Sequence, residues 1–174
     1  MSVHVVTMGV SGSGKSTVAE GVVERTAWVF AEADAFHPQA NIDKMSQGIP
    51  LTDEDRWPWL HDLAAWMAEH AARGEDTVIT CSALKRTYRD VLRADVAALG
   101  AGHRVVFAHL DGSAAVIADR LEGRQGHFMP ASLLQSQIDT LEDLEPDEDG
   151  VVLDLTAAPE VLVDRVMASV ATGR

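Results

Sequence analysis

The segment Gly9 to Thr17 constrains this chain most, because its sequence, GVSGSGKST, fits the phosphate-binding pattern G-x-x-x-x-G-K-[ST]. Apolar residues 3–8 predict a strand before it, and Val18 and Val22 predict one face of a helix after it. Glycines allow the backbone to curl so that successive N–H groups point at phosphate oxygens, and the helix N-terminus adds partial positive charge. The sequence therefore predicts an α/β protein that binds a nucleotide.

Each position of this loop has an expected task in binding ATP. Lys15 should reach the β- and γ-phosphates, and the Ser16 hydroxyl should bind Mg²⁺. The residues expected to contact ATP are Gly9, Val10, Ser11, Gly12, Ser13, Gly14, Lys15, Ser16 and Thr17. The loop alone does not separate kinases from ATPases, GTPases or motors, although the chain has no Asn-Lys-x-Asp signature for guanine.

Composition limits the remaining possibilities. A chain of 174 residues with 47% apolar side chains can bury one core, so we expect a single domain over residues 1–174. The formal charge of −13 opposes binding to nucleic acid or anionic lipid. No apolar run is long enough to cross a bilayer, and the start does not resemble a secretory leader. We therefore expect a cytoplasmic protein with a small-molecule substrate, no nucleic-acid partner and no membrane association.

Strand and helix patterns alternate along the whole chain. Strands are expected at 3–8, 27–33, 77–81, 104–110 and 151–155, and helices after the loop, within 37–51, and at 53–73, 85–99, 113–121, 131–144 and from Pro159 onward. This order predicts a five-stranded parallel sheet with helices on both faces. Ligands in such sheets bind at the carboxyl ends of the strands, which selects the candidate site.

Several polar residues follow those strand ends. Asp34 could accept the proton of an attacking hydroxyl, or it could be a turn or capping residue. Glu32 could hold Mg²⁺ through water, or it could be a surface carboxylate. Arg120 and Arg124 lie one helical turn apart before an aperiodic segment, and so indicate a lid at about 121–131, although they could instead bond helix carbonyls.

Other conspicuous residues allow two interpretations. The cluster of Lys85, Arg86, Arg89 and Arg93 could attract an anionic substrate or form a solvated helix face. His127 could touch a ligand or anchor its loop. The tryptophans at 57, 59 and 66 are expected in the core or an interface, and Cys81 is expected to be a small buried residue.

The chain resembles the gluconokinase family, small P-loop sugar-acid kinases related in fold to shikimate and adenylate kinases. The resemblance spans nearly the whole chain and is most specific at Asp34-Ala35-Phe36-His37-Pro38 and Cys81-Ser82-Ala83-Leu84-Lys85. Further matching segments are Met8 to Ser16, Asn41, Lys44-Met45, Gly48, Pro50-Leu51, Asp55-Arg56, Pro58-Trp59-Leu60, Tyr88-Arg89-Asp90, Leu92-Arg93, Gly126-His127-Phe128 and Gln137 to Glu142. Ala33 departs from the glycine that the family commonly has there, which adds a methyl group at the strand end.

The resemblance implies roles for individual residues. Asp34 would be the base or orienting carboxylate for the gluconate 6-hydroxyl. The residues implied in the acceptor pocket are Asp34, His37, Arg56, Lys85, Arg89, His127 and Gln137. Arg120 and Arg124 would lie over ATP as lid arginines, with Lys15, Asp34 and Arg124 catalytic. The family also suggests a homodimer.

Together these observations predict phosphorylation of D-gluconate to 6-phospho-D-gluconate by Mg²⁺ and ATP. Two alternatives stay open: a related kinase acting on another sugar acid, and a nucleotide-binding regulatory module without transfer activity. The intact Asp34 and Lys15, with the paired lid arginines Arg120 and Arg124, disfavour the second alternative, because a pure binder has no need of a base facing the phosphate loop.

Overall fold

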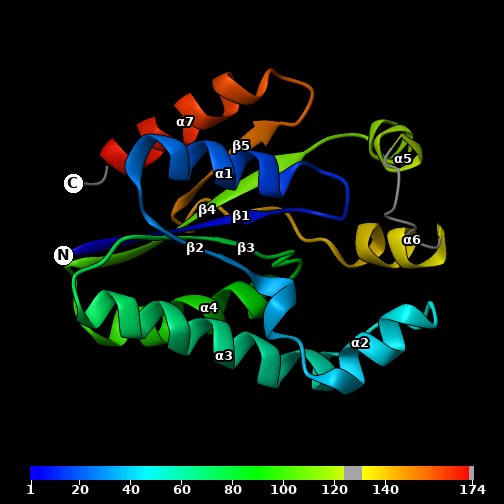
Figure 1. Ribbon diagram of the computed structural model, residues 1–174, viewed down its shortest axis with the longest axis horizontal. Helices are drawn as coiled ribbons and strands as arrows, with labels where there is room; N and C mark the ends of the chain where they lie inside the picture. Colours follow the sequence, from blue (N-terminus) through cyan, green and yellow to red (C-terminus); the bar gives the residue numbers. More distant parts are fainter. Residues whose placement is uncertain (124–130, 173–174) are drawn as a thin grey trace.

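A five-stranded parallel β-sheet runs through the middle of the computed structural model, which describes residues 1–123 and 131–172 (Figure 1). The strands are β1 (Ser2–Met8), β2 (Val29–Glu32), β3 (Thr77–Thr80), β4 (His103–Asp111) and β5 (Gly150–Asp154). Their order across the sheet is β2-β3-β1-β4-β5. The chain therefore fills one side of β1 first and the other side later, which makes the carboxyl end of β1 the switch point where such sheets bind ligands.

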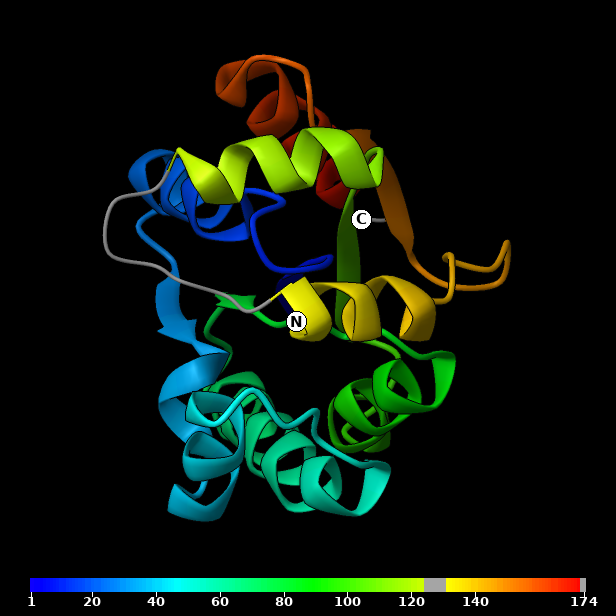
Figure 2. The ribbon, with the colours of Figure 1, turned by 90° about the vertical axis from the view of Figure 1, so that its right-hand side faces the viewer.

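Helices connect and cover these strands. They are α1 (Lys15–Thr26), the 3₁₀ helix η1 (Ala33–Phe36), α2 (Gln39–Ser46), α3 (Asp53–Ala72), α4 (Arg86–Ala98), α5 (Ala114–Glu122), α6 (Ala131–Thr140) and α7 (Pro159–Thr172). Helices α1 and α7 lie on one face of the sheet and α3 and α4 on the other (Figure 1). Helices α2, α5 and α6 lie around the carboxyl ends of the strands (Figure 2). This confirms the predicted α/β class, with helices on both faces.

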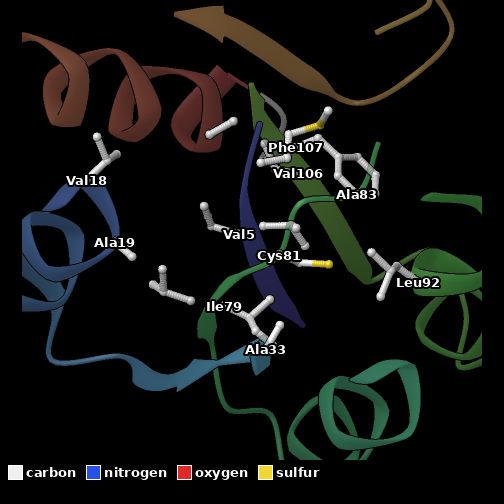
Figure 3. Close-up of a cluster of buried hydrophobic side chains, with 14 of the residues drawn as sticks. Val5, Val18, Ala19, Ala33, Ile79, Cys81, Ala83, Leu92, Val106 and Phe107 are labelled. Carbon is white, nitrogen blue, oxygen red and sulfur yellow. The ribbon is translucent and has the colours of Figure 1, made fainter. Parts of the chain in front are cut away.

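The core lies on both faces of β1, so that the polar side chains of Ser2, His4 and Thr7 are buried along with the apolar ones. All seven residues of β1 are buried, as is expected when helices cover both faces of a parallel sheet. Val5 pairs with Val78 of β3 and with Val106 of β4, and all three are fully buried. Figure 3 shows Val18 and Ala19 of α1 on one side of Val5, in the same buried cluster as Val106. The predicted inner face of α3 is also confirmed, since Leu60, Leu63, Ala64, Met67 and Ala71 are buried.

Local signals account for most element ends. The Ser113 hydroxyl accepts a hydrogen bond from the Val116 N–H, which confirms the predicted N-cap of α5. Helix α3 begins with a reciprocal capping box between Thr52 and Asp55. Strand β2 is shorter than predicted. Ala27 ends α1 in the left-handed region at φ 56°, so β2 starts only at Val29.

Helix α6 ends at Thr140 rather than 144, because a contact from outside the helix competes with its continuation. The Glu142 N–H donates to the Leu84 carbonyl at 2.7 Å, which draws the chain toward the segment after β3. Among the described residues, no helix is long and apolar enough to cross a membrane.

Candidate active site

The phosphate loop follows β1 directly and joins it to α1, as predicted. Gly9 and Gly14 adopt φ 137° and 99°, where glycine is strongly favoured over residues with a Cβ. A Cβ on Gly9 would also lie 2.8 Å from the Leu110 carbonyl oxygen. Lys15 folds over this loop, with Nζ donating to the Gly9 and Val10 carbonyls at 3.2 and 3.0 Å. The loop thus has the left-handed glycines and the lysine that a phosphate-binding loop requires.

A cavity of about 360 Å³ opens beside this loop at the carboxyl edge of the sheet. It is lined by the loop itself, the segments that follow β2 and β3, residues 45–51, the first turns of α3 and the helix α6. The predicted site residues among its lining are Ser11, Gly12, Gly14, Lys15, Ser16, Glu32, Asp34, His37, Arg56 and Gln137. The fold therefore brings a phosphate-binding loop and a second polar wall into one cavity.

Asp34 lies on η1, directly after β2, with a side chain that is 94% exposed. Its Oδ1 atom is 3.9 Å from Nε2 of His37. Burial of the imidazole lowers the pKa of His37, so this side chain is neutral at pH 7. The carboxylate is therefore free to meet an acceptor hydroxyl while His37 stays uncharged beside it.

Two neighbours fix the orientation of His37. Its ring stacks on Trp59 with centroids 4.2 Å apart, and the Trp59 indole donates to the Ala33 carbonyl at 2.8 Å. Asn41 donates through Nδ2 to the Asp55 carbonyl at 2.9 Å, and the same nitrogen lies 3.3 Å from His37 Nδ1. An amide nitrogen cannot accept, so Nδ1 is the acceptor and the imidazole proton is on Nε2, on the side of Asp34.

Arg56 extends from the first turns of α3 into the cavity wall. Its Nη1 donates to the Tyr88 hydroxyl at 2.8 Å, and that hydroxyl donates to Asp53. Lys85 donates to both oxygens of Asp53 at 3.1 Å. The Tyr88 hydroxyl and then Lys85, as hydrogen-bond donors, hold the pKa of Asp53 below its usual value.

Gln137 reaches the phosphate loop from α6. Its Oε1 accepts a hydrogen bond from the Ser11 N–H at 2.7 Å. Gln137 also lines the cavity, so it lies between the loop and the acceptor side. This contact joins α6 to the loop.

Arg120 lies next to the phosphate loop as well. Its Nη1 donates to the Ser13 carbonyl at 3.3 Å, and its Nη2 donates to the Leu155 carbonyl. A second cavity of about 270 Å³ borders Gly12, Gly14, Thr17, Arg120 and Pro159. The predicted contact of Arg120 with ATP is compatible with this position and stays a prediction.

The residues proposed for Mg²⁺ have chemistry that suits it. Ser16 and Glu32 line the same cavity, and Glu32 accepts a hydrogen bond from the Thr80 hydroxyl. Mg²⁺ in phosphate-transfer sites typically takes one or two protein oxygens, phosphate oxygens and water, so a hydroxyl and a carboxylate beside the loop fit it. Within the described ranges there is no cluster of three or more metal-ligating side chains that would hold a metal without the nucleotide.

Arg89 corrects one expectation. Its side chain is fully buried, and its guanidinium donates to both oxygens of Glu148 at 2.7 and 2.8 Å. The remaining N–H groups donate to the carbonyls of Ala83, Glu142 and Asp143 at 3.0–3.1 Å. Arg89 therefore holds the chain after α6 against the start of α4, and it does not line the acceptor cavity.

The remaining predictions divide between described and undescribed residues. Lys85 pairs with Asp53 rather than lining the cavity. Arg124, His127 and most of the predicted lid at 121–131 lie outside the described residues. Cys81 is buried as expected, and burial raises the pKa of its thiol to about 12.

Sequence patterns did not predict some of the residues that form the site. Trp59 belongs to the core, as predicted, but it also lines the cavity and orients His37. Asn41, Asp53 and Tyr88 were given no role, although Asn41 and Tyr88 stand in the segments that carry the family resemblance. Their tasks depend on contacts between α2, α3 and α4, which no sequence spacing indicates.

Comparisons with known proteins agree with this geometry. A protein-family model described as an AAA domain matches residues 5–144. The gluconokinase of Gluconobacter oxydans is 48% identical over 162 residues, which cover 93% of this chain and 88% of that protein. The thermosensitive gluconokinase of Escherichia coli is 46% identical over 145 residues, which cover 83% and 74%.

Solved structures resemble the chain over nearly its full length. An unliganded sugar kinase from a Janibacter species has a TM-score of 0.90 at 60% identity, covering 98% of this chain and 95% of that one. A gluconokinase from Sinorhizobium meliloti 1021 has a TM-score of 0.80 at 48% identity, covering 97% and 91%.

The nucleotide-binding loop at the switch point of a parallel sheet, together with these relatives, defines a P-loop kinase. Because relatives with more than 40% identity match over most of both chains, the family can be stated more closely. The chain belongs to the gluconokinase family.

Proposed function

We propose that this protein transfers the γ-phosphoryl group of ATP to the 6-hydroxyl of D-gluconate. The observation that carries the proposal is that one cavity of about 360 Å³ is lined by Lys15, Asp34 and Arg56. Lys15 suits the transferred phosphate, Asp34 suits the attacking hydroxyl and Arg56 suits the carboxylate at the other end of a sugar acid. The names of the relatives support gluconate as that acid.

The chain's own residues would act mainly by positioning and charge. The N–H groups of the loop and Lys15 would hold the β- and γ-phosphates, with Arg120 beside them. The gluconate O6 atom would form a bond to the γ-phosphorus while the bond to the β-phosphate oxygen breaks. Asp34 would orient the hydroxyl and accept its proton, giving 6-phosphogluconate and ADP.

Ser16 and Glu32 would hold Mg²⁺, Glu32 through water. When bound there, Mg²⁺ would supply positive charge that neutralises the phosphate oxygens in the transition state. Arg124 and a lid over 121–131 are proposed to complete the ATP side, and closure would exclude water that could otherwise hydrolyse ATP.

His37 and Gln137 would serve the acceptor hydroxyls. The neutral His37 offers a donor at Nε2, and Gln137 offers both donor and acceptor groups from α6. His127 is proposed as a further partner. We also propose that the protein is a cytoplasmic homodimer. Size-exclusion chromatography with light scattering would test the dimeric state.

A coupled assay with purified protein tests the proposal. ATP consumption should be compared among gluconate, shikimate, adenosine monophosphate and other sugar acids. We expect turnover with gluconate to exceed that with every other acceptor. Turnover with a different sugar acid alone would leave a kinase with another substrate, and no turnover with any acceptor, despite ATP binding, would favour a regulatory nucleotide-binding module.

A further inference from the structure

A chain of hydrogen bonds runs behind the acceptor wall, from α3 to the start of α4. Arg56 donates to the Tyr88 hydroxyl at 2.8 Å, and that hydroxyl donates to Asp53. Lys85 closes the chain by donating to both Asp53 oxygens at 3.1 Å. The tyrosine hydroxyl therefore stands between a guanidinium and a carboxylate of opposite charge.

Asp53 and Arg56 are three residues apart on the same helix, a spacing at which opposite charges usually meet. In the described part of the chain, however, no ion pair joins them directly. Asp53 is paired with Lys85, and Arg56 contacts the neutral hydroxyl of Tyr88. Arg56 thus lines the cavity wall without a direct salt bridge to another described residue.

The ring of Tyr88 is held in place independently of its hydroxyl. Tyr88 is 1% exposed, and its ring meets Trp57 edge-on with centroids 5.5 Å apart. Arg56 Cζ and Lys85 Nζ lie 5.3 and 5.5 Å from the ring centroid. Removing the hydroxyl alone should leave the ring in position.

We propose that Tyr88 is a positioning residue that keeps Arg56 apart from Asp53, so that Arg56 remains available to the carboxylate of the acceptor. This inference rests on the proposed function, because it gives Arg56 that ligand. It also gives a role to Lys85, which pairs with Asp53 and does not line the cavity. Lys85 is the counterion of Asp53, which would otherwise compete for Arg56.

The variant Tyr88→Phe tests this role. Without the hydroxyl, Arg56 should turn to Asp53, and we expect the KM for gluconate to rise about tenfold. The kcat and the KM for ATP should change less than about twofold, because the phosphate loop is untouched. Circular dichroism and the unfolding midpoint should confirm that the variant folds.

The double variant Tyr88→Phe with Asp53→Asn distinguishes two roles of Tyr88. Either its hydroxyl keeps Arg56 apart from Asp53, or Tyr88 only supports the cavity wall by packing. Removing the competing carboxylate should restore most of the gluconate KM, since Arg56 is released. A further loss in the double variant would overturn the proposal, because it would show that Asp53 and Tyr88 act together to hold Arg56.

A crystal structure of Tyr88→Phe gives a readout that does not depend on gluconate. We expect an Arg56 nitrogen within 4 Å of an Asp53 oxygen, and an Arg56 side chain that has not moved would overturn the proposal. If the wild-type protein fails to phosphorylate gluconate, the proposed function fails, while this structural result still decides whether Tyr88 separates the two charges.

Discussion

Arg56 lines the cavity and forms no ion pair with another described residue, although the chain is rich in acidic residues. The sequence holds 14 lysines and arginines against 27 acidic residues, and many of the basic side chains are paired. Lys15 and Arg56 are the lysine and arginine among the described residues that line the cavity of about 360 Å³. Lys15 belongs to the phosphate loop, so we propose that Arg56 recognises the anionic acceptor.

At the same scale, Asp34→Asn should remove turnover but not nucleotide binding. The amide keeps the size of the side chain but cannot accept the hydroxyl proton, so we expect kcat to fall at least about 100-fold. The Kd for ATP, measured by calorimetry, should stay within about twofold. A variant with retained turnover would remove Asp34 from the role of base.

The placement of a residue could be predicted where a motif ties it to one element, and its role stays a prediction. The phosphate loop, Asp34 and Arg56 follow from local patterns and the family resemblance, and the structure brings them to one cavity. Arg89 was predicted to lie in the acceptor pocket because a cluster of basic residues has the same sequence pattern whether it faces a ligand or a buried carboxylate. Its partner, Glu148, is 59 residues away, and no spacing indicates that pairing.

At the scale of elements, the Arg89–Glu148 pair fixes the chain after α6 to α4. Both side chains are fully buried, and Arg89 also binds the carbonyls of Glu142 and Asp143. Helix α6 in turn carries Gln137, which contacts the phosphate loop at Ser11. The pair therefore supports the position of a helix that borders both the phosphate loop and the cavity.

Arg89→Met should destabilise the fold by about 3 to 5 kcal/mol, because it leaves the Glu148 carboxylate buried without its partner. Urea unfolding would measure this loss. Arg93→Met is the matched control: Arg93 contacts the same carboxylate at 3.4 Å but is 26% exposed, so its loss should cost about 1 kcal/mol or less. Loss of gluconate affinity in Arg89→Met without a loss of stability would instead make Arg89 an acceptor ligand.

Element boundaries show how far local patterns carry. The alternation of strands and helices was predicted correctly because hydrophobic periodicity and caps such as Ser113 are local. The early end of α6 and the short β2 were not predicted. The first depends on a hydrogen bond to Leu84, and the second on a left-handed Ala27, which sequence patterns rarely reveal.

At the scale of the whole molecule, buried histidines make stability depend on pH. His4 is fully buried, and its ring nitrogens contact the hydroxyls of Ser2 and Thr77 at 2.8 Å. Burial lowers the pKa of His4 from 6.5 to about 4. Between these values the unfolded chain binds a proton that the folded chain does not, so stability falls as pH decreases.

We expect His4 to contribute up to about 3 kcal/mol of this loss between pH 6.5 and 4. Burial also lowers the pKa of His109, which adds to the loss in the same direction. Urea unfolding at pH 7 and pH 4.5 should show a smaller difference for His4→Gln than for the wild type. The exposed His61 on α3 supplies the control variant His61→Gln. An equal pH dependence in His4→Gln and wild type would contradict this account.

Whether one cavity joins ATP to a sugar acid held by Arg56 can be decided by comparing two acceptors. D-Glucitol has the same six-carbon chain as gluconate with an alcohol in place of the carboxylate. We predict that the wild type prefers gluconate by at least about 100-fold in kcat/KM, since a bidentate charged contact is worth several kcal/mol. Arg56→Met should lose most of that preference. Absence of gluconate turnover in the wild type, or an undiminished preference in Arg56→Met, would contradict the account.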